Sequence, residues 1–260
     1  MTDKSVADKP TLVLLHGWGV NQGVWQSIRQ RLPVALSVVT PDLPGFGLAQ
    51  QYPTPYTLDA VCDVLVAQIP DGSAVCGWSL GGLVALALAK RYPEKVSKLA
   101  LVAASPCFLT QTDWPGMAPT VMQQFARALS DNLQQTIERF LAIQAMGSDS
   151  ARADTKALRQ AILAYPLAQP PAVAAALQLL TDMDLRAELA GLSIPLAGLY
   201  GRLDSLVPVR VVEQLQQLQP QGSFSILPHA SHAPFISHPA AFLAWLEQWL
   251  SPSGNSSIAG

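Results

Sequence analysis

Residues 73–90 read Ser-Ala-Val-Cys-Gly-Trp-Ser-Leu-Gly-Gly-Leu-Val-Ala-Leu-Ala-Leu-Ala-Lys and place a serine inside a glycine-rich turn. The apolar run that ends at Gly77 predicts a buried strand, and Leu80–Lys90 predicts a helix. A sharp strand-to-helix turn crowds the positions two residues before and after Ser79, so Gly77 and Gly81 meet a steric need. This G-x-S-x-G pattern is the signature of a serine nucleophile on such a turn. An inert serine in a tight glycine turn is the alternative.

The rest of the chain also alternates short apolar runs with longer helical patterns. The apolar runs lack polar alternation, which is typical of strands in a parallel sheet covered on both faces. The sequence therefore predicts an α/β fold with a mostly parallel central sheet flanked by helices. The predicted strands are Thr11–Leu15, Ser37–Thr40, Ser73–Gly77, Lys98–Ala103, Leu196–Tyr200 and Ser223–Leu227.

The interval between the fourth and fifth predicted strands is long and has a helical pattern without a convincing strand. A stretch of this length inside one domain should carry its own structure. We predict that residues 107–190 form a helical cap inserted into a core made of residues 1–106 and 191–250. The cap would cover the carboxyl ends of the strands, where open α/β sheets bind ligands. The small, polar residues 251–260 predict a disordered tail.

Composition narrows the class of protein. The chain has 260 residues, of which 50% are hydrophobic and 13% charged, and its net charge of −2 does not support binding nucleic acid over its whole surface. No apolar run approaches the roughly 18 residues that span a bilayer, and the first ten residues contain no signal-like apolar run. Three scattered cysteines predict free thiols in a reducing compartment. We expect a cytoplasmic enzyme without metal or cofactor.

A serine nucleophile needs a general base, and histidine is the usual one. On a strand–turn–helix serine site the residues follow in the order serine, acid, histidine. Only the three histidines after residue 200 fit this order: His229, His232 and His238. Loop reach from the last strand favours His232, and His229 remains open on spacing alone.

The acid should follow a strand that lies between the serine and the base. Asp204 is the first carboxylate after Leu196–Tyr200, and it could hold the imidazole in the correct tautomer. The alternative is that Asp204 only caps a helix that begins near Pro208.

Two backbone amides should stabilise the oxyanion of the tetrahedral intermediate. One is the amide of Leu80, directly after the nucleophile, and the other is expected from Trp18 in the loop His16–Gly19. His16 itself is better explained as part of this loop than as the base. The side chain of Trp78 could line an acyl pocket or simply pack in the core.

At this point the chain resembles the α/β-hydrolase superfamily through His16–Gly19, Asp42–Gly47 and Gly77–Gly82. More specifically, it is similar to the family of pimeloyl-[acyl-carrier protein] methyl ester esterases of biotin synthesis (the BioH family), from about Thr11 to Leu250. The more specific segments are Gly77–Leu83, Ala104–Phe108, Asp113–Gly116, Glu138–Ala142 with Gln144 and Met146-Gly147, and His232–Pro239.

The resemblance implies an α/β-hydrolase fold with Ser79 as nucleophile, Asp204 as acid and His232 as base, and it thereby selects His232 over His229. The implied reaction is hydrolysis of the methyl ester at the far end of a carrier-bound pimeloyl chain, which releases methanol. The implied substrate contacts are Trp18, Ser79, Leu80, Phe140, Leu141, Ala142, Ile143, Gln144 and His232.

The implied partner is an acyl carrier protein, whose acidic surface would need a basic dock. The candidate docking residues are Arg139, Arg152, Lys156 and Arg159. The last three lie at i, i+4 and i+7, which is one face of a helix. An ordinary solvated face is the alternative, because Asp149 and Asp154 are interspersed. We expect a monomer without nucleic-acid or membrane partners.

Two rival functions share these motifs. A broad short-chain carboxylesterase, a lipase-like enzyme or a carbon–carbon bond hydrolase would use the same serine, acid and histidine. A dehalogenase or epoxide hydrolase would want a carboxylate at position 79 instead. A catalytically silent ligand-binding protein on this scaffold is the rival from another class, and an intact Ser79, Asp204 and His232 argues against it.

Overall fold

The computed structural model describes residues 10–132, 135–137 and 151–251. Within them, one sheet has the strand order β2-β1-β3-β4-β5-β6, and every neighbouring pair is parallel. The predicted parallel α/β sheet is therefore confirmed, with strand ends shifted by at most two residues. The strands are β1 (Thr11–Leu15), β2 (Ser37–Val39), β3 (Ser73–Trp78), β4 (Val96–Val102), β5 (Leu196–Gly201) and β6 (Ser223–Leu227).

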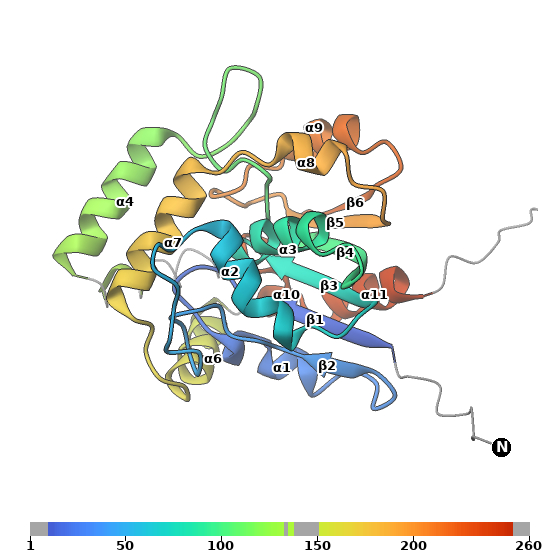
Figure 1. Cartoon of the computed structure of the whole chain (residues 1–260), viewed down its shortest axis with the longest axis horizontal. Coiled ribbons are helices and arrows are strands. Elements are labelled where there is room, and N and C mark those ends of the chain that lie inside the picture. Colours follow the sequence, from blue (N-terminus) through green and yellow to red (C-terminus); the bar gives the residue numbers. More distant parts are fainter. Residues whose placement is uncertain (1–9, 133–134, 138–150, 252–260) are drawn as a thin grey trace, which may run out of the picture.

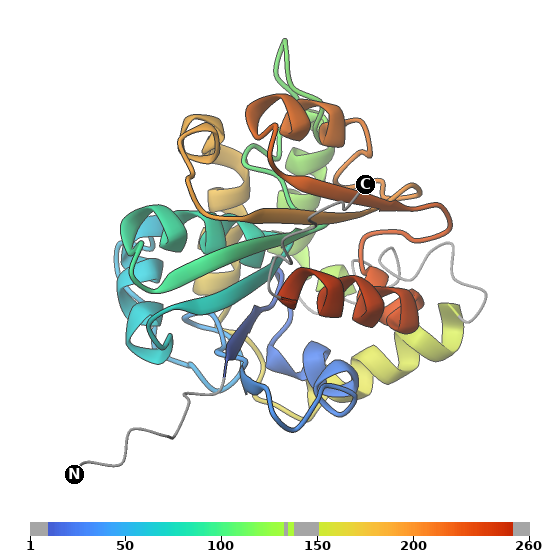
Figure 2. The same cartoon turned by 90° about the vertical axis from the view of Figure 1, so that its right-hand side faces the viewer.

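Alternate residues of each strand enter two separate apolar clusters, one on each face of the sheet. In β1, Val13 and Leu15 join one cluster, whereas Leu12 and Leu14 join the other. Figure 2 shows the helices on the two sides of the sheet. The first face is covered by α2 (Leu58–Leu65), η2 (Val66–Gln68), α3 (Leu80–Arg91), α8 (Arg186–Ala190) and α9 (Val211–Leu218). The second is covered by η1 (Gln22–Trp25), α1 (Gln26–Arg29), α10 (Pro234–Ser237) and α11 (Pro239–Leu250).

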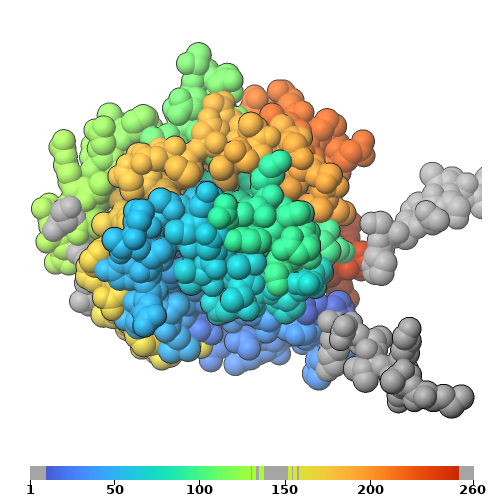
Figure 3. All heavy atoms as spheres, viewed as in Figure 1, coloured from blue at the N-terminus to red at the C-terminus, as the bar shows by residue number. Residues whose placement is uncertain are grey.

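The segment between β4 and β5 is helical in its described part, where β pairing is limited to isolated bridges. Besides α8, it contains α4 (Pro119–Asp131), α6 (Ala151–Leu163) and α7 (Pro170–Asp182). These three helices lie at the end of the molecule toward which the strands run (Figure 1). In the space-filling view their surface, green to gold, covers much of that end (Figure 3).

The two ends of this segment are joined beside the sheet. Cys107 and Asp184 form an isolated antiparallel bridge, and the amide of Leu185 donates to the carbonyl of Pro106 at 2.8 Å. Arg186 lies over the ring of Trp114, whose indole nitrogen donates to the Cys107 carbonyl at 2.9 Å. The beginning and the end of the segment between β4 and β5 are thus held together.

Two further features to compare with the sequence are the carboxyl-terminal tail and the apolar length of the helices. Of the predicted disordered tail 251–260, only Ser251 lies among the described residues. Over the described part of the chain, no helix combines the length and the apolar character that crossing a membrane requires.

Candidate active site

Ser79 lies at the junction of β3 and α3, in a strained backbone conformation with φ 54° and ψ −120°. Few non-glycine residues adopt such a positive φ, and this cost persists only where the surroundings enforce it. A Cβ at Gly77 would overlap the Gly81 carbonyl oxygen, and a Cβ at Gly81 would lie 2.5 Å from the His16 carbonyl oxygen. The glycines thus permit a turn that holds the serine at the amino end of α3, where helix amides and dipole favour negative charge.

Asp204 and His232 form a buried pair. Nδ1 of His232 lies 2.8 Å from Oδ2 of Asp204, and both side chains are at most 1% exposed. The other carboxylate oxygen accepts the amides of Leu206 and Val207 at 2.8 and 3.0 Å. Asp204 therefore orients the imidazole and also caps a turn. It does not cap the next helix, because α9 begins only at Val211.

The other two late histidines lie elsewhere. His229 is exposed, and His238 is partly buried with its Nδ1 2.8 Å from the Ser237 hydroxyl. The structure therefore brings His232, and not His229, to Asp204. The loops that carry Asp204 and His232 are also held together, since the Leu203 amide donates to the Ala230 carbonyl at 3.0 Å.

His16 is buried and its ring is bonded on both sides. Its Nδ1 donates to the Gly17 carbonyl at 2.8 Å, and its Nε2 accepts the amide of Leu43 at 2.9 Å. Burial lowers the pKa of His16 and outweighs the opposite effect of the Asp42 carboxylate, so the ring is neutral. Asp42 in turn accepts the amides of Gln22 and Leu48. The sequence placed His16 in the loop, but it did not reveal this network.

The loop that carries Trp18 passes directly beside the serine. A Cβ on Gly17 would lie 3.3 Å from the Ser79 Cβ, so the two backbones are in close contact. The Trp18 side chain is 1% exposed, its indole nitrogen donates to the Val173 carbonyl of α7 at 2.9 Å, and its ring contacts Phe125 of α4 edge-on. Trp18 therefore joins the loop after β1 to two helices of the segment between β4 and β5.

The predicted substrate and docking residues fall into two groups. Arg139 and Phe140–Gln144 lie outside the described residues. Arg152, Lys156 and Arg159 are exposed on α6. Of the two alternatives for Trp78, the structure has the packing one, because this side chain is fully buried.

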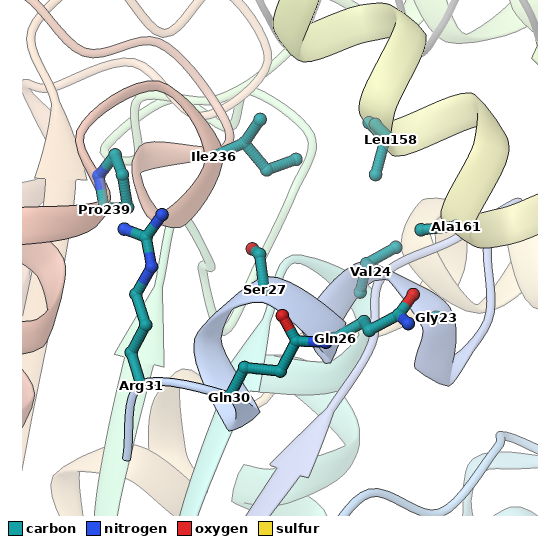
Figure 4. Close-up of a pocket in the computed structure, with 10 residues that line it drawn as sticks. All are labelled: Gly23, Val24, Gln26, Ser27, Gln30, Arg31, Leu158, Ala161, Ile236 and Pro239. Carbon is teal, nitrogen blue, oxygen red and sulfur yellow. The ribbon is translucent and has the colours of Figure 1, made fainter.

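On its inner side, α6 borders a pocket of about 380 Å³ that also meets α1 and α10. Figure 4 shows Leu158 of α6 and Ile236 of α10 across the pocket from polar side chains of α1. The lining residues are Gly23, Val24, Gln26, Ser27, Gln30, Arg31, Leu158, Ala161, Ile236 and Pro239.

The three cysteines are free and buried, as expected for reduced thiols. Burial raises the pKa of Cys62 to about 12, so this thiol is a poor nucleophile. Among the described residues, no cluster of three or more His, Cys, Asp or Glu side chains is suited to hold a metal ion.

Comparison with known proteins adds to this geometry. The model of the "alpha/beta hydrolase fold" family matches residues 10–239. A protein of Pseudoalteromonas atlantica is 48% identical over 92% of this chain and 94% of its own length, and it is named pimeloyl-[acyl-carrier protein] methyl ester esterase. Proteins of Klebsiella pneumoniae (47%, over 89% of this chain and 90% of theirs) and Edwardsiella ictaluri (47%, over 92% and 93%) have the same name.

Solved structures agree on the fold. An esterase from Exiguobacterium antarcticum superposes with a TM-score of 0.83 at 19% identity, over 92% of this chain and 91% of that one. A thermophilic esterase from Thermogutta terrifontis superposes with a TM-score of 0.74 at 25% identity, over 93% and 89%.

Proposed function

We propose a function from one premise: the chain belongs to the α/β-hydrolase fold family, within the group whose curated members are named pimeloyl-[acyl-carrier protein] methyl ester esterase. It is a serine carboxylesterase that hydrolyses the methyl ester of pimeloyl-[acyl-carrier protein] to pimeloyl-[acyl-carrier protein] and methanol, a step of biotin biosynthesis. The observations that carry the chemistry are the buried Asp204–His232 pair and a serine held in a strained strand-to-helix turn, whose neighbour Trp78 is hydrogen-bonded to the His232 backbone.

The reaction has two steps. His232 takes the proton of Ser79 as the hydroxyl oxygen attacks the ester carbonyl, and Asp204 stabilises the imidazolium that forms. His232 then gives the proton to the departing methanol, and water activated by the same imidazole releases the acid from Ser79. We assign the oxyanion hole to the amides of Leu80 and Trp18, and such a donor is typically worth about 3 kcal/mol of barrier.

The helices of residues 107–190 supply the wall on the substrate side. Because Trp18 joins α4 and α7 to the loop beside Ser79, we propose that this segment is a cap over the ester site. An apolar channel under such a cap would hold the methylene chain of the substrate, with about 0.8 kcal/mol from each buried methylene group. Residues Phe140–Gln144, with Trp18, Ser79, Leu80 and His232, are the proposed contacts.

The exposed face of α6 supports docking of an acidic carrier. Arg152, Lys156 and Arg159 share one exposed stripe, which continues into Leu163 at the carboxyl end of the helix, 56% exposed. A stripe of cations that ends in an apolar side chain suits a partner surface that is acidic with an apolar edge. With Arg139 this stripe is our proposed dock, on a protein that we expect to act as a cytoplasmic monomer.

The test is demethylation of the carrier-bound ester by the purified protein, with Ser79→Ala and Asp204→Asn alongside and dimethyl pimelate as the free competitor. We expect turnover by the wild type, about 10⁴-fold or greater loss in both variants, and preference for the carrier-bound ester. Equal rates on short free esters of any chain length, with no use of the carrier, would instead identify a broad carboxylesterase. Failure of a fluorophosphonate probe to label Ser79 would contradict the serine mechanism itself.

A further inference from the structure

Trp78 stands between the first glycine of the turn and the nucleophile, so its backbone is bonded directly to Ser79. Its side chain is fully buried at the end of β3 and contacts Trp25 and Phe235, at ring-centroid distances of 6.5 and 5.0 Å. A Cβ at Gly17 would lie 3.0 Å from Cε3 of the indole. The side chain thus lies against the loop of Trp18 as well as in the aromatic cluster.

The indole also reaches the general base through a long-range contact. Nε1 of Trp78 donates to the backbone carbonyl of His232 at 2.8 Å, across 154 positions of the sequence, and the two rings lie 5.7 Å apart. Donor and acceptor are both buried, so neither finds water if the bond is broken. The imidazole of His232 is oriented by Asp204, whereas its peptide is held by Trp78.

We propose, on the premise of the esterase function above, that Trp78 is a positioning residue for the nucleophile and the base. Trp78 is linked to Ser79 through its backbone and to the peptide of His232 through its indole N–H. One residue therefore sets the distance between Ser79 and His232. Indole suits this role because it spans the distance with two rotatable bonds and ends in a single donor. Packing within the aromatic cluster is the competing explanation, and it predicts no special effect of the N–H group.

The chain supplies a matched control. Trp25 is equally buried and packs on the same Phe235, but its indole nitrogen has no hydrogen-bond acceptor among the described residues. Trp25→Phe therefore removes an indole from the cluster but no hydrogen bond to His232. Trp78→Phe removes an indole and also the hydrogen bond to His232. Benzothienylalanine at position 78 is a sharper probe, because sulfur replaces the N–H group and the bicyclic shape is kept.

The experiment measures kcat and KM on dimethyl pimelate and the rate of Ser79 labelling by a fluorophosphonate. We expect Trp78→Phe and the benzothienyl variant to lower kcat and the labelling rate about 10- to 100-fold, the loss typical of a slightly misplaced catalytic group. KM should stay within about 2-fold, since no substrate contact is removed. Trp25→Phe should leave kcat within about 3-fold of the wild type. Equal losses in the Trp25 and Trp78 variants, or none in the benzothienyl variant, would overturn the proposal.

A second readout does not depend on activity. The proton between His232 and Asp204 should give a low-field NMR resonance in the wild type and in Trp25→Phe. We expect this resonance to shift or broaden in the benzothienyl variant, and an unchanged resonance with unchanged labelling would contradict the positioning role. Failure of the proposed function is distinguishable, because a protein that ignores the carrier-bound ester would still show the difference between the Trp25 and Trp78 variants in labelling and NMR.

Discussion

Helices α6 and α7 have the same length, 13 residues, and both lie between β4 and β5, but they pack on the rest of the protein differently. On α7, Ala172, Val173 and Ala176 are completely buried, whereas α6 exposes Arg152 and Lys156. The sequence of α7 is dominated by small and apolar residues, and that of α6 alternates charges with apolar residues. Helix α7 is thus buried along the side that faces the core, whereas α6 combines a buried inner side with an exposed charged face.

The contacts of the two helices agree with this division. The amide of Gln169, just before α7, donates to the Gly45 carbonyl at 2.8 Å, and Trp18 donates to Val173. At the carboxyl end of α6, the side-chain amide of Asn21 donates to the backbone carbonyl of Ile162 at 3.0 Å. Proteins hold a reacting site with rigid, closely packed elements, and they leave partner recognition to accessible faces.

The largest expected effect is at the contact between α7 and the core. Gly45 has φ +87°, and a Cβ there would overlap the Cβ of Ala172. Gly45→Ala should therefore lower the free energy of unfolding by about 2–4 kcal/mol, from backbone strain and overpacking together. Gly72→Ala is the control, because Gly72 also has positive φ (+68°) but open space around it, and it should cost only about 1 kcal/mol. Urea denaturation measures both, and equal losses would mean that α7 is not closely packed on the core.

The second effect concerns the inner side of α6. Leu158 is 4% exposed, and Leu158→Ala should lower the free energy of unfolding by about 2–3 kcal/mol through lost burial and a cavity. Leu163→Ala, five residues along the same helix at 56% exposure, should stay within about 0.5 kcal/mol. Thermal or urea denaturation of the pair checks this, and a matching loss in both variants would show that the exposed stripe is a packed surface.

The third effect is a dependence of stability on pH at the loop that α7 covers. The folded protein keeps His16 neutral with a lowered pKa, whereas the unfolded chain binds a proton below about pH 6.5. The free energy of unfolding should therefore fall as pH decreases from about 6.5 to the lowered pKa, by at most about 1.4 kcal/mol per pH unit for this group. Below the lowered pKa, His16 is protonated in both the folded and the unfolded chain, so it no longer makes the free energy of unfolding depend on pH.

Urea denaturation of His16→Gln across this range tests the assignment. The variant should be less stable at neutral pH but should lack this part of the pH dependence. His229→Gln, at an exposed position, is the control. An identical pH slope in the wild type and in His16→Gln would show that folding does not lower the pKa of His16.

The smallest effect on stability, and the most specific effect on function, is expected on the outer face of α6. Reversal of Lys156 or Arg159 to Glu should raise KM for the carrier-bound ester about 2- to 5-fold each, and increasing salt should reduce the difference. Activity on dimethyl pimelate and stability should change little. Lys90→Glu, an exposed cation at the end of α3, is the charge-matched control. An equal change in KM for both sites would mean that only net charge matters.

The strands and the serine turn could be predicted because each is encoded locally. Ser73–Trp78 is a continuous apolar run followed by glycines at the two crowded positions, so neighbouring residues alone specify strand, turn and helix. The boundary of β4 was less accurate, because Val96 joins the sheet through pairing with Ser73, which no local pattern shows. The cap, the oxyanion hole and the docking stripe remain predictions.

The choice between His229 and His232 shows where local information ends. Both follow β6; loop reach favoured His232 without excluding His229, the family resemblance selected His232, and the structure then placed it against Asp204. The bonds of His16 to Gly17 and Leu43, and of Trp78 to His232, had no signal beyond the presence of the residues themselves.

The sequence by itself determined the class of fold and the chemistry of the serine turn, because strand periodicity and glycine sterics act between residues close in the chain. Only the tertiary structure showed that His232 meets Asp204, which ring nitrogen of His16 accepts a hydrogen bond, and which tryptophan of the aromatic cluster is bonded to the His232 backbone. These choices depend on the direction of single hydrogen bonds between segments as far as 154 positions apart. Such distances are set by the packing of the whole sheet and its helices, which no short stretch of sequence contains.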